Sequence, residues 1–392
     1  MQNAYLPSAA IGPNTRHLFV EHKPGHAFLF NTYAEIPDSQ LISLPPDLGR
    51  KANRAIRYLE RSLAPQLKTL TFLTLGLLIR EPNSSSWIDF LCRLEMPVFG
   101  IMHCFPIWPR GLYKAAKRIT IIVLEESLAN KLQEEHGIQN VICLPLHPTH
   151  SMYLNQDSKS VRKFMGVKPG QIVFSVLGGV RAGKGIELLM SAFSHLSPED
   201  RAQAFFLFGG YSEDIEKSSI EKALVNSGCH GYVDLRKSIG TSSYYVALTE
   251  REFGQYVNAA DIGLLFYKCG QREIMSGVLP DYVYARKPVI ATSDSVVGDL
   301  VKKYDLGMVL KREEPREVAN TIARALRAYR NGYTPTEAYE SFRTMSLTDS
   351  VVQKFSFILN HPNTNLSPLA GSGTRTSYAA DSAAAAGPVS TL

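Results

Sequence analysis

From residue 171 onward, apolar runs alternate with amphipathic segments in a regular order. The first run, QIVFSVLGG, is rich in β-branched and aromatic residues, ends in glycines and is typical of a buried strand. Similar runs predict strands at 171–179, 204–210, 230–235, 261–267, 288–291 and 307–310. Helical spacing predicts helices at 186–196, 212–227, 250–260, 279–286, 297–303 and 315–330. This alternation indicates a parallel, doubly wound α/β sheet.

The first 150 residues are less regular but of the same kind. Strands are expected at 17–22, 96–103, 119–124 and 140–145, with a helix at 125–136. The apolar run at 70–79 is a buried strand or core segment, because a membrane-spanning helix needs roughly 20 residues. A chain of 392 residues suits two such domains.

Composition narrows the class of partner only slightly. A net charge of +6 is too small to indicate nucleic-acid binding, and it suits an anionic small substrate or an anionic membrane surface. The five cysteines include no Cys-x-x-Cys pair, which favours reduced thiols in the cytoplasm. The first 13 residues lack the basic start and apolar run of a secretory signal. We therefore expect a cytoplasmic protein.

The segment GGVRAGKG at 178–185 follows a predicted strand and opens a predicted helix. Glycines let the backbone approach an anion closely, and the first N–H groups of a helix point toward it. Arg181 and Lys184 add positive charge at the same turn. The segment therefore predicts an anion site.

Two other interpretations of this turn are open. It nearly matches a nucleotide-hydrolase P-loop, but Gly185 stands where a Ser or Thr hydroxyl must hold magnesium. Asp261 also opens its strand, whereas a P-loop enzyme needs an acidic residue at a strand end. The second interpretation is an ordinary strand-to-helix turn that binds nothing.

A pair of carboxylates marks the segment EIMSGVLPDYVYARKPVIAT at 273–292. Glu273 and Asp281 flank seven residues, and Ser276 and Gly277 precede a predicted helix whose first N–H groups suit phosphate. Asp281 could accept hydrogen bonds from ribose hydroxyls, and Glu273 could do the same for a sugar ring. A solvated loop carboxylate is the other interpretation of Glu273.

This segment resembles the Glu-x7-Glu motif of retaining glycosyltransferases with the GT-B fold, close to glycosyltransferase family 4. Asp281 replaces the second Glu and is one methylene shorter. The resemblance implies two Rossmann-like domains with parallel sheets facing across a cleft. It also implies a UDP- or GDP-sugar donor and transfer to a glycan acceptor with retention of configuration.

Further segments extend the resemblance over about residues 16–330. VLGGVRAGKGIELLMSAF is similar to the family's donor-phosphate segment, which implies that Gly179, Arg181 and Lys184 hold the diphosphate beside Ser276, Gly277 and Val278. MPVFGIMH implies that His103 lies near the transferred sugar, although a structural histidine is the other interpretation. KPGH at 23–26 implies that Gly25 lies near the donor.

The domain organisation follows from the same pattern. We expect an acceptor-side domain at 1–150, a polar linker at 151–166 and a donor-binding domain at 167–335. A helix within 336–366 should return toward the N-terminal domain. Residues 367–392 are small and polar, which predicts a disordered tail.

The chain contains no Asp-x-Asp pair and no His/Cys cluster with metal spacing, so we expect neither a metal nor another cofactor. A diphosphate leaving group must still be neutralised as the glycosidic bond breaks. The cations at 181 and 184 and the N–H groups near Gly277 suit that task. The catalytic candidates are therefore His103, Arg181, Lys184 and Glu273.

Arginines at 50, 54, 57 and 61 would form one stripe on a helix, and 105–118 adds aromatics beside more cations. Such surfaces bind anionic bilayers, which suggests peripheral membrane attachment and a lipid-linked acceptor. A solvated face is the other interpretation. Two alternative functions also stay open: a P-loop-like nucleotidase, and a catalytically silent GT-B protein acting as a partner subunit.

Overall fold

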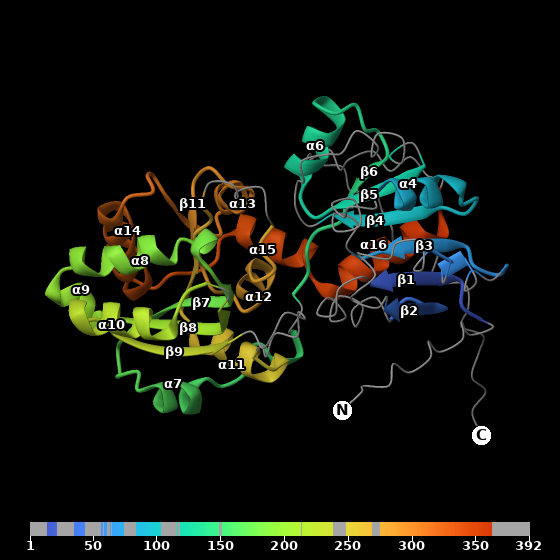
Figure 1. Cartoon of the computed structure of the whole chain (residues 1–392). Helices are drawn as coiled ribbons and strands as arrows, with labels where there is room; N and C mark the ends of the chain where they lie inside the picture. Colours follow the sequence, from blue (N-terminus) through green and yellow to red (C-terminus); the bar gives the residue numbers. More distant parts are fainter. Residues whose placement is uncertain are drawn as a thin grey trace, which may run out of the picture.

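The chain forms two six-stranded parallel sheets, each in its own half of the molecule (Figure 1). The computed structural model describes residues 14–21, 35–43, 56–57, 59–60, 63, 65–73, 84–102, 116, 118–148, 151–212, 214–237, 248–268 and 275–362. The expected α/β class with two Rossmann-like halves is confirmed.

The C-terminal sheet has the strand order β12-β11-β10-β7-β8-β9. Its strands are β7 (Ile172–Val180), β8 (Ala204–Ser212), β9 (His230–Lys237), β10 (Ile262–Leu265), β11 (Val289–Thr292) and β12 (Gly307–Leu310). Its helices are α8 (Ile186–Ala192), α9 (Pro198–Gln203), α10 (Lys217–Ser227), α11 (Glu250–Ala259), α12 (Leu279–Tyr284), α13 (Val296–Tyr304) and α14 (Pro315–Arg330). Buried strands explain the continuous apolar runs of the sequence, since helices cover both faces.

The two faces of this sheet belong to different cores. Phe174 and Phe206 stack on one face with ring centroids 5.7 Å apart, and α8, α10 and α14 cover them. Val173 and Leu207 belong to the other face, whose core includes α11, α12 and α13. That second core is continuous with the N-terminal half. One side of the C-terminal sheet therefore packs toward the other domain.

The N-terminal sheet has the order β2-β1-β3-β4-β5-β6. Its strands are β1 (His17–Glu21), β2 (Ser39–Ser43), β3 (Thr69–Phe72), β4 (Val98–Met102), β5 (Ile119–Val123) and β6 (Val141–Cys143). The helices α4 (Ser84–Arg93) and α6 (Glu126–Glu134) belong to this half. These short strands again explain the apolar runs of the sequence. The residues of β2 and α4 show no clear periodicity of apolar positions and were not predicted.

The last two helices run back from the C-terminal half to the N-terminal sheet (Figure 1). They are α15 (Glu337–Met345) and α16 (Thr348–Asn360). Phe355 of α16 packs edge-on against Phe19 of β1 at 5.9 Å, and Lys354 Nζ donates to the carbonyl of Cys143 at 2.9 Å. The C-terminal helix is thus part of the N-terminal core.

The segment expected to be an irregular linker contains a helix, α7 (Lys159–Met165), preceded by the short turn η2 (Ser151–Tyr153). Arg162 of α7 forms two hydrogen bonds to Asp261, at 3.1 and 2.8 Å. Asp261 also accepts from the Val173 N–H and the Tyr329 hydroxyl. The polar linker therefore contains a helix that its weak periodicity did not predict, and an ion pair between residues 99 positions apart holds this helix to the C-terminal sheet.

None of the helices in the described ranges is long and apolar enough to cross a bilayer. The apolar run at 70–79 begins with β3, and its residues 74–79 lie outside the described part of the chain.

Candidate functional site

The strand order of the C-terminal sheet reverses between β7 and β10. From β7 the chain continues to β8 on one side, and β10 is followed by β11 on the other. In doubly wound sheets, ligands bind beyond the carboxyl ends of the strands at such a switch point. The segments at 178–185 and 275–281 follow β7 and β10, so both lie at this place.

Glycines are required where β7 and β8 end side by side. Gly178 pairs with Gly210, and both have positive φ, +90° and +143°. A Cβ at Gly210 would lie 1.9 Å from the carbonyl oxygen of Gly178, and one at Gly179 would lie 2.8 Å from the Tyr211 hydroxyl. A larger residue is therefore excluded at Gly210 and strained at Gly178, so the two strands end side by side as bare backbone.

The two motifs predicted from the sequence meet at Gly178. A Cβ there would lie 3.4 Å from Val278 Cγ2 and 3.6 Å from Lys184 Nζ. The same ammonium lies 3.4 Å from the carbonyl oxygen of Leu177. A lysine cation, a glycine backbone and the start of the second motif therefore share one location, although nearly 100 residues separate them in sequence.

The turn after β7 is the short 3-10 helix η3 (Ala182–Lys184). It is held from two sides: Asp214 accepts from the Ala182 N–H at 3.0 Å, and the Lys268 N–H donates to the Gly183 carbonyl at 3.0 Å. The N–H groups of Lys184 and of the following glycine bond within the turn. The N–H groups of Ala182, Lys184 and Gly185 are therefore already used, and the positive charge at this turn comes from the side chains of Arg181 and Lys184.

The second motif is mostly buried. Gly277 is exposed, whereas Ser276, Val278 and Asp281 are 1%, 8% and 0% exposed. Asp281 lies in the first turn of α12, as the sequence predicted. Because its carboxylate is fully buried, a ligand can reach Asp281 only if neighbouring atoms make room.

Tyr267, just beyond β10, connects the two motifs. Burial raises the pKa of Tyr267, while the neighbouring Ser276 hydroxyl and the positive charge of Arg181 oppose that rise. The phenol is therefore neutral at physiological pH. Its surroundings indicate that Arg181 and Ser276 both approach the end of β10.

A polar cluster that the sequence did not reveal lies at the ends of β8 and β9. Tyr256 donates to Asp234 at 2.7 Å, and Arg236 donates to Glu252 at 2.6 Å. The hydrogen bond from Arg236 lowers the pKa of Glu252 to about 2. A Cβ at Gly209 would lie 2.7 Å from the Tyr256 ring, so this cluster adjoins the glycine-rich strand ends. No motif marks these residues, because only the fold brings them together.

Three of the predicted site residues, His103, Glu273 and Gly25, lie outside the described residues. So do three of the four arginines in the basic stripe; Arg57, the fourth, is exposed. Within the described ranges, no group of three or more His, Cys, Asp or Glu side chains could hold a metal ion.

The whole architecture recurs in solved structures. HepE of Anabaena in complex with UDP-glucose superposes with a TM-score of 0.66 at 13% identity, over 88% of this chain and 99% of that one. Sucrose-phosphate synthase of Thermosynechococcus elongatus gives 0.66 at 12% identity, with the same coverage. The two parallel six-stranded sheets of this chain match the fold of these structures. The chain has a GT-B fold.

A third similar structure with this fold is WaaG, a glycosyltransferase involved in lipopolysaccharide biosynthesis. It gives a TM-score of 0.59 at 14% identity, over 88% of this chain and 99% of that one. No protein-family model and no curated protein sequence matches the chain. At these identities the likeness establishes the fold alone.

Proposed function

We propose that this chain is a glycosyltransferase that moves a sugar from a UDP- or GDP-sugar to an acceptor. The observation that carries the proposal is the meeting of Lys184, the bare backbone at Gly178 and the start of the second motif at the switch point. A diphosphate needs this combination of close backbone approach and fixed cations. HepE, of the same fold, was solved with UDP and with UDP-glucose, which supports a nucleotide-sugar donor.

The site residues divide by the part of the donor they would contact. Arg181 and Lys184 hold the diphosphate, with Gly179 giving room for it and the segment Ser276–Val278 closing over it. Asp281 holds the ribose after a local rearrangement, and Glu273 holds the transferred sugar. His103 and Gly25, in the N-terminal half, complete the donor site.

The chemistry proposed is metal-independent transfer with retention of configuration. As the bond from the sugar to the diphosphate breaks, negative charge grows on the leaving oxygen. The ammonium of Lys184 and the guanidinium of Arg181 stabilise that charge in place of a metal ion. The acceptor hydroxyl attacks from the side of the leaving group, which preserves the configuration.

The acceptor proposed is a glycan, with a lipid-linked glycan at an anionic membrane surface as its most specific form. The basic stripe that includes Arg57 supports it, since each cation near such a surface contributes about 1 kcal/mol. Co-sedimentation with anionic vesicles at low salt tests this part. Equal pelleting with neutral vesicles would contradict it.

The deciding experiment combines calorimetry and a transfer assay. We expect UDP or GDP to bind, and one member of a nucleotide-sugar panel to release its nucleotide and transfer its sugar, in excess chelator as well as without it. Loss of activity on chelation with recovery on Mg²⁺ would overturn the metal-independent chemistry. ATP hydrolysis without sugar turnover would favour the nucleotidase, and the absence of both activities would favour a silent partner subunit.

A further inference from the structure

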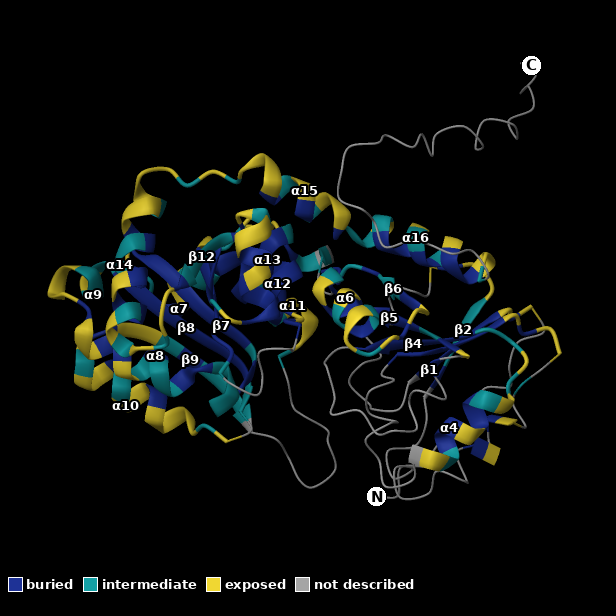
Figure 2. Cartoon of the chain, turned by 90° about the horizontal axis from the view of Figure 1, so that it is seen from above, coloured by how far each residue is buried: buried dark blue, intermediate teal, exposed yellow. Residues whose placement is uncertain are grey.

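A pocket of about 170 Å³ lies at the opposite edge of the C-terminal sheet from the switch point. Its floor is formed by the first residues of β10, β11 and β12, and the second half of α14 covers it. α14 packs against β12, which Figure 2 shows near it. We call it the amino-edge pocket; its lining includes Ile262, Val289, Met308, Ala328, Tyr329 and Tyr333.

The volume and the lining of this pocket suit a ligand with a single aromatic ring. A protein cavity of about 150 Å³ with apolar walls is large enough for benzene. Ile262 and Val289 are 3% and 1% exposed and provide an apolar floor, while Tyr329 and Tyr333 provide aromatic walls. Gly307 at the pocket edge cannot be replaced by a residue with a side chain, because a Cβ there would lie 2.1 Å from the carbonyl oxygen of Val289. The space is thus set by the backbone.

Two polar groups in the lining give the pocket a chemical preference. The hydroxyl of Tyr333 is buried and makes no hydrogen bond within the described part of the chain. Asp305 is exposed at the rim and forms no ion pair with any described residue. Asp305 and Tyr333 line the same pocket. Burial, Asp305 and Glu340 all raise the pKa of the Tyr333 phenol. Glu340 is neutralised by Arg286 and Arg343, which leaves Asp305 as the charge at the rim.

We propose that the amino-edge pocket binds a one-ring organic amine. The ring lies between the apolar floor and the two tyrosines. The ammonium donates to the Asp305 carboxylate at the rim and, after a shift of the Tyr333 side chain that exposes its buried hydroxyl, to that oxygen, and it gains cation–π attraction from the aromatic walls. The site is separate from the switch point, so its ligand and a nucleotide occupy opposite edges of one sheet.

Ligand-observed NMR with benzylamine, benzyl alcohol and benzoate tests the proposal. We expect benzylamine to bind with a dissociation constant on the order of 1 mM, as its few heavy atoms allow. Benzyl alcohol should bind about fivefold more weakly, and benzoate more weakly still, because of the rim carboxylate. Equal binding of the amine and the carboxylate would overturn the assigned chemistry.

Two variants locate the ligand. Ala325→Leu, at a lining position that is 4% exposed, fills the pocket from α14 and should abolish binding, whereas Ala323→Leu, on the same helix outside the lining, should not change it. Asp305→Asn should remove the preference for benzylamine over benzyl alcohol; Asn tolerates the left-handed backbone at this position, where φ is +51°. Unchanged binding in Ala325→Leu, or displacement of benzylamine by UDP, would overturn the proposal. The leucine substitution in the pocket lining tests the amine site even if the protein binds no nucleotide.

Discussion

At the scale of single residues, the side chains that matter most are those whose partners come from distant segments. Lys184 was singled out by its place in a glycine-rich turn, and the structure gives it a neighbour from the second motif. His147 carried no signal in the sequence, yet it is 1% exposed in the segment after β6. Each of the two leads to a prediction that a single substitution can test.

Lys184→Ala should weaken binding of UDP or GDP about 10- to 100-fold, because a charge-assisted hydrogen bond to phosphate contributes about 1.5–3 kcal/mol. Turnover should fall further, since charge on the diphosphate grows in the transition state. Calorimetry and initial rates measure both. Lys302→Ala, which removes an exposed lysine from α13, is the matched control and should change neither. Equal affinity of Lys184→Ala and the wild type would remove the donor site proposed here.

Asp281→Asn should lower nucleotide affinity but leave the affinity for pyrophosphate unchanged, because the carboxylate is assigned to the ribose. Since Asp281 is fully buried, the melting temperature must be measured beside the calorimetry. A parallel loss of affinity for nucleotide and pyrophosphate would place Asp281 outside ribose recognition. Asp299→Asn, at an exposed position in α13, controls for the loss of one negative charge.

Stability should fall in mild acid because of His147. Burial lowers the pKa of this imidazole from 6.5 to about 4. Between these values the unfolded chain binds a proton that the folded chain does not, so stability declines as pH falls through this window. The loss from this group between pH 7.5 and pH 5 should be about 2 kcal/mol in urea unfolding. His147→Gln should show a smaller decline; an identical decline in both proteins would contradict the assignment.

At the scale of elements, α7 shows how an ion pair decides structure where periodicity is weak. Asp261 receives four hydrogen bonds, from Arg162, the Val173 N–H and the Tyr329 hydroxyl, and so joins α7, β7 and α14. Its side chain is 8% exposed, and that of Arg162 is 26% exposed. The first strand of the C-terminal domain is therefore fixed at its amino end by one carboxylate.

Asp261→Ala should cost about 3–5 kcal/mol, because it removes the charged partner of a half-buried guanidinium, which keeps only the Gln171 carbonyl, and leaves two further donors without this acceptor. Urea unfolding measures the change. Asp299→Ala, which removes an exposed carboxylate 3.9 Å from Lys302, should stay within about 0.5 kcal/mol of the wild type. Equal effects of the two substitutions would show that the network at Asp261 contributes little.

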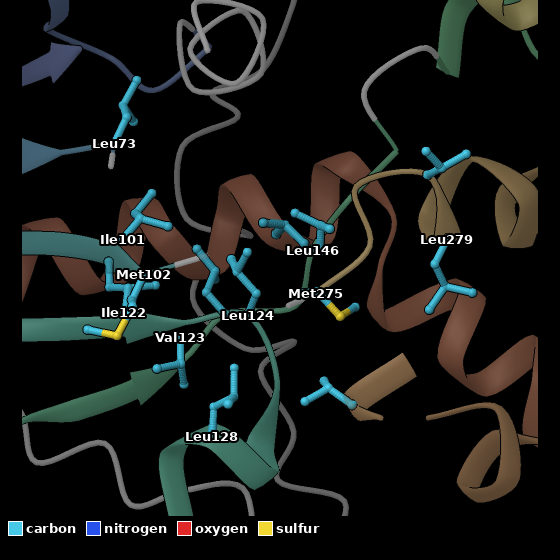
Figure 3. Packing of buried hydrophobic residues seen from close by; sticks show 14 of the residues in the cluster. Leu73, Ile101, Met102, Ile122, Val123, Leu124, Leu128, Leu146, Met275 and Leu279 are labelled. Carbon is cyan, nitrogen blue, oxygen red and sulfur yellow. The ribbon is translucent and has the colours of Figure 1, made fainter. Parts of the chain in front are cut away.

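At the scale of the whole molecule, apolar contacts unite the two halves. Leu124, Leu128 and Leu146 of the N-terminal half belong to the same buried cluster as Met275 and Leu279 of the second motif. Figure 3 shows Met275 between Leu146 and Leu279. The cross-domain ion pair of Lys303 with Glu126, at 2.7 Å, is half exposed and adds little by comparison. The second motif itself thus forms part of the contact between domains.

The helix α16 should be essential to the N-terminal half. Phe355→Ala removes a fully buried ring from the contact with Phe19 and should cost about 3–5 kcal/mol. Phe357→Ala, on the same helix but 40% exposed, should cost under about 1 kcal/mol. Thermal unfolding of the two variants compares them. Residues 367–392, predicted to be a disordered tail, lie outside the described part of the chain.

The sequence alone determined the elements whose signal is local. The strands β7, β8, β10 and β12 and the helix α14 follow from runs and spacings within 20 residues, and the helix 315–330 has the predicted bounds. The positive φ at Gly178 and Gly185 also agrees with the local sequence, because glycine adopts this backbone conformation without steric cost. The GT-B fold followed from this order of elements together with the resemblance of two motifs.

Only the tertiary structure decided what lies next to what. It brought Lys184 to Val278, used the N–H of Ala182 for Asp214, and buried Asp281 completely. It also formed α7 around Asp261 and placed Phe355 in the core of the other half. These outcomes depend on contacts between residues about 30 to more than 300 positions apart, and the free energy of such contacts leaves no periodic trace in the local sequence.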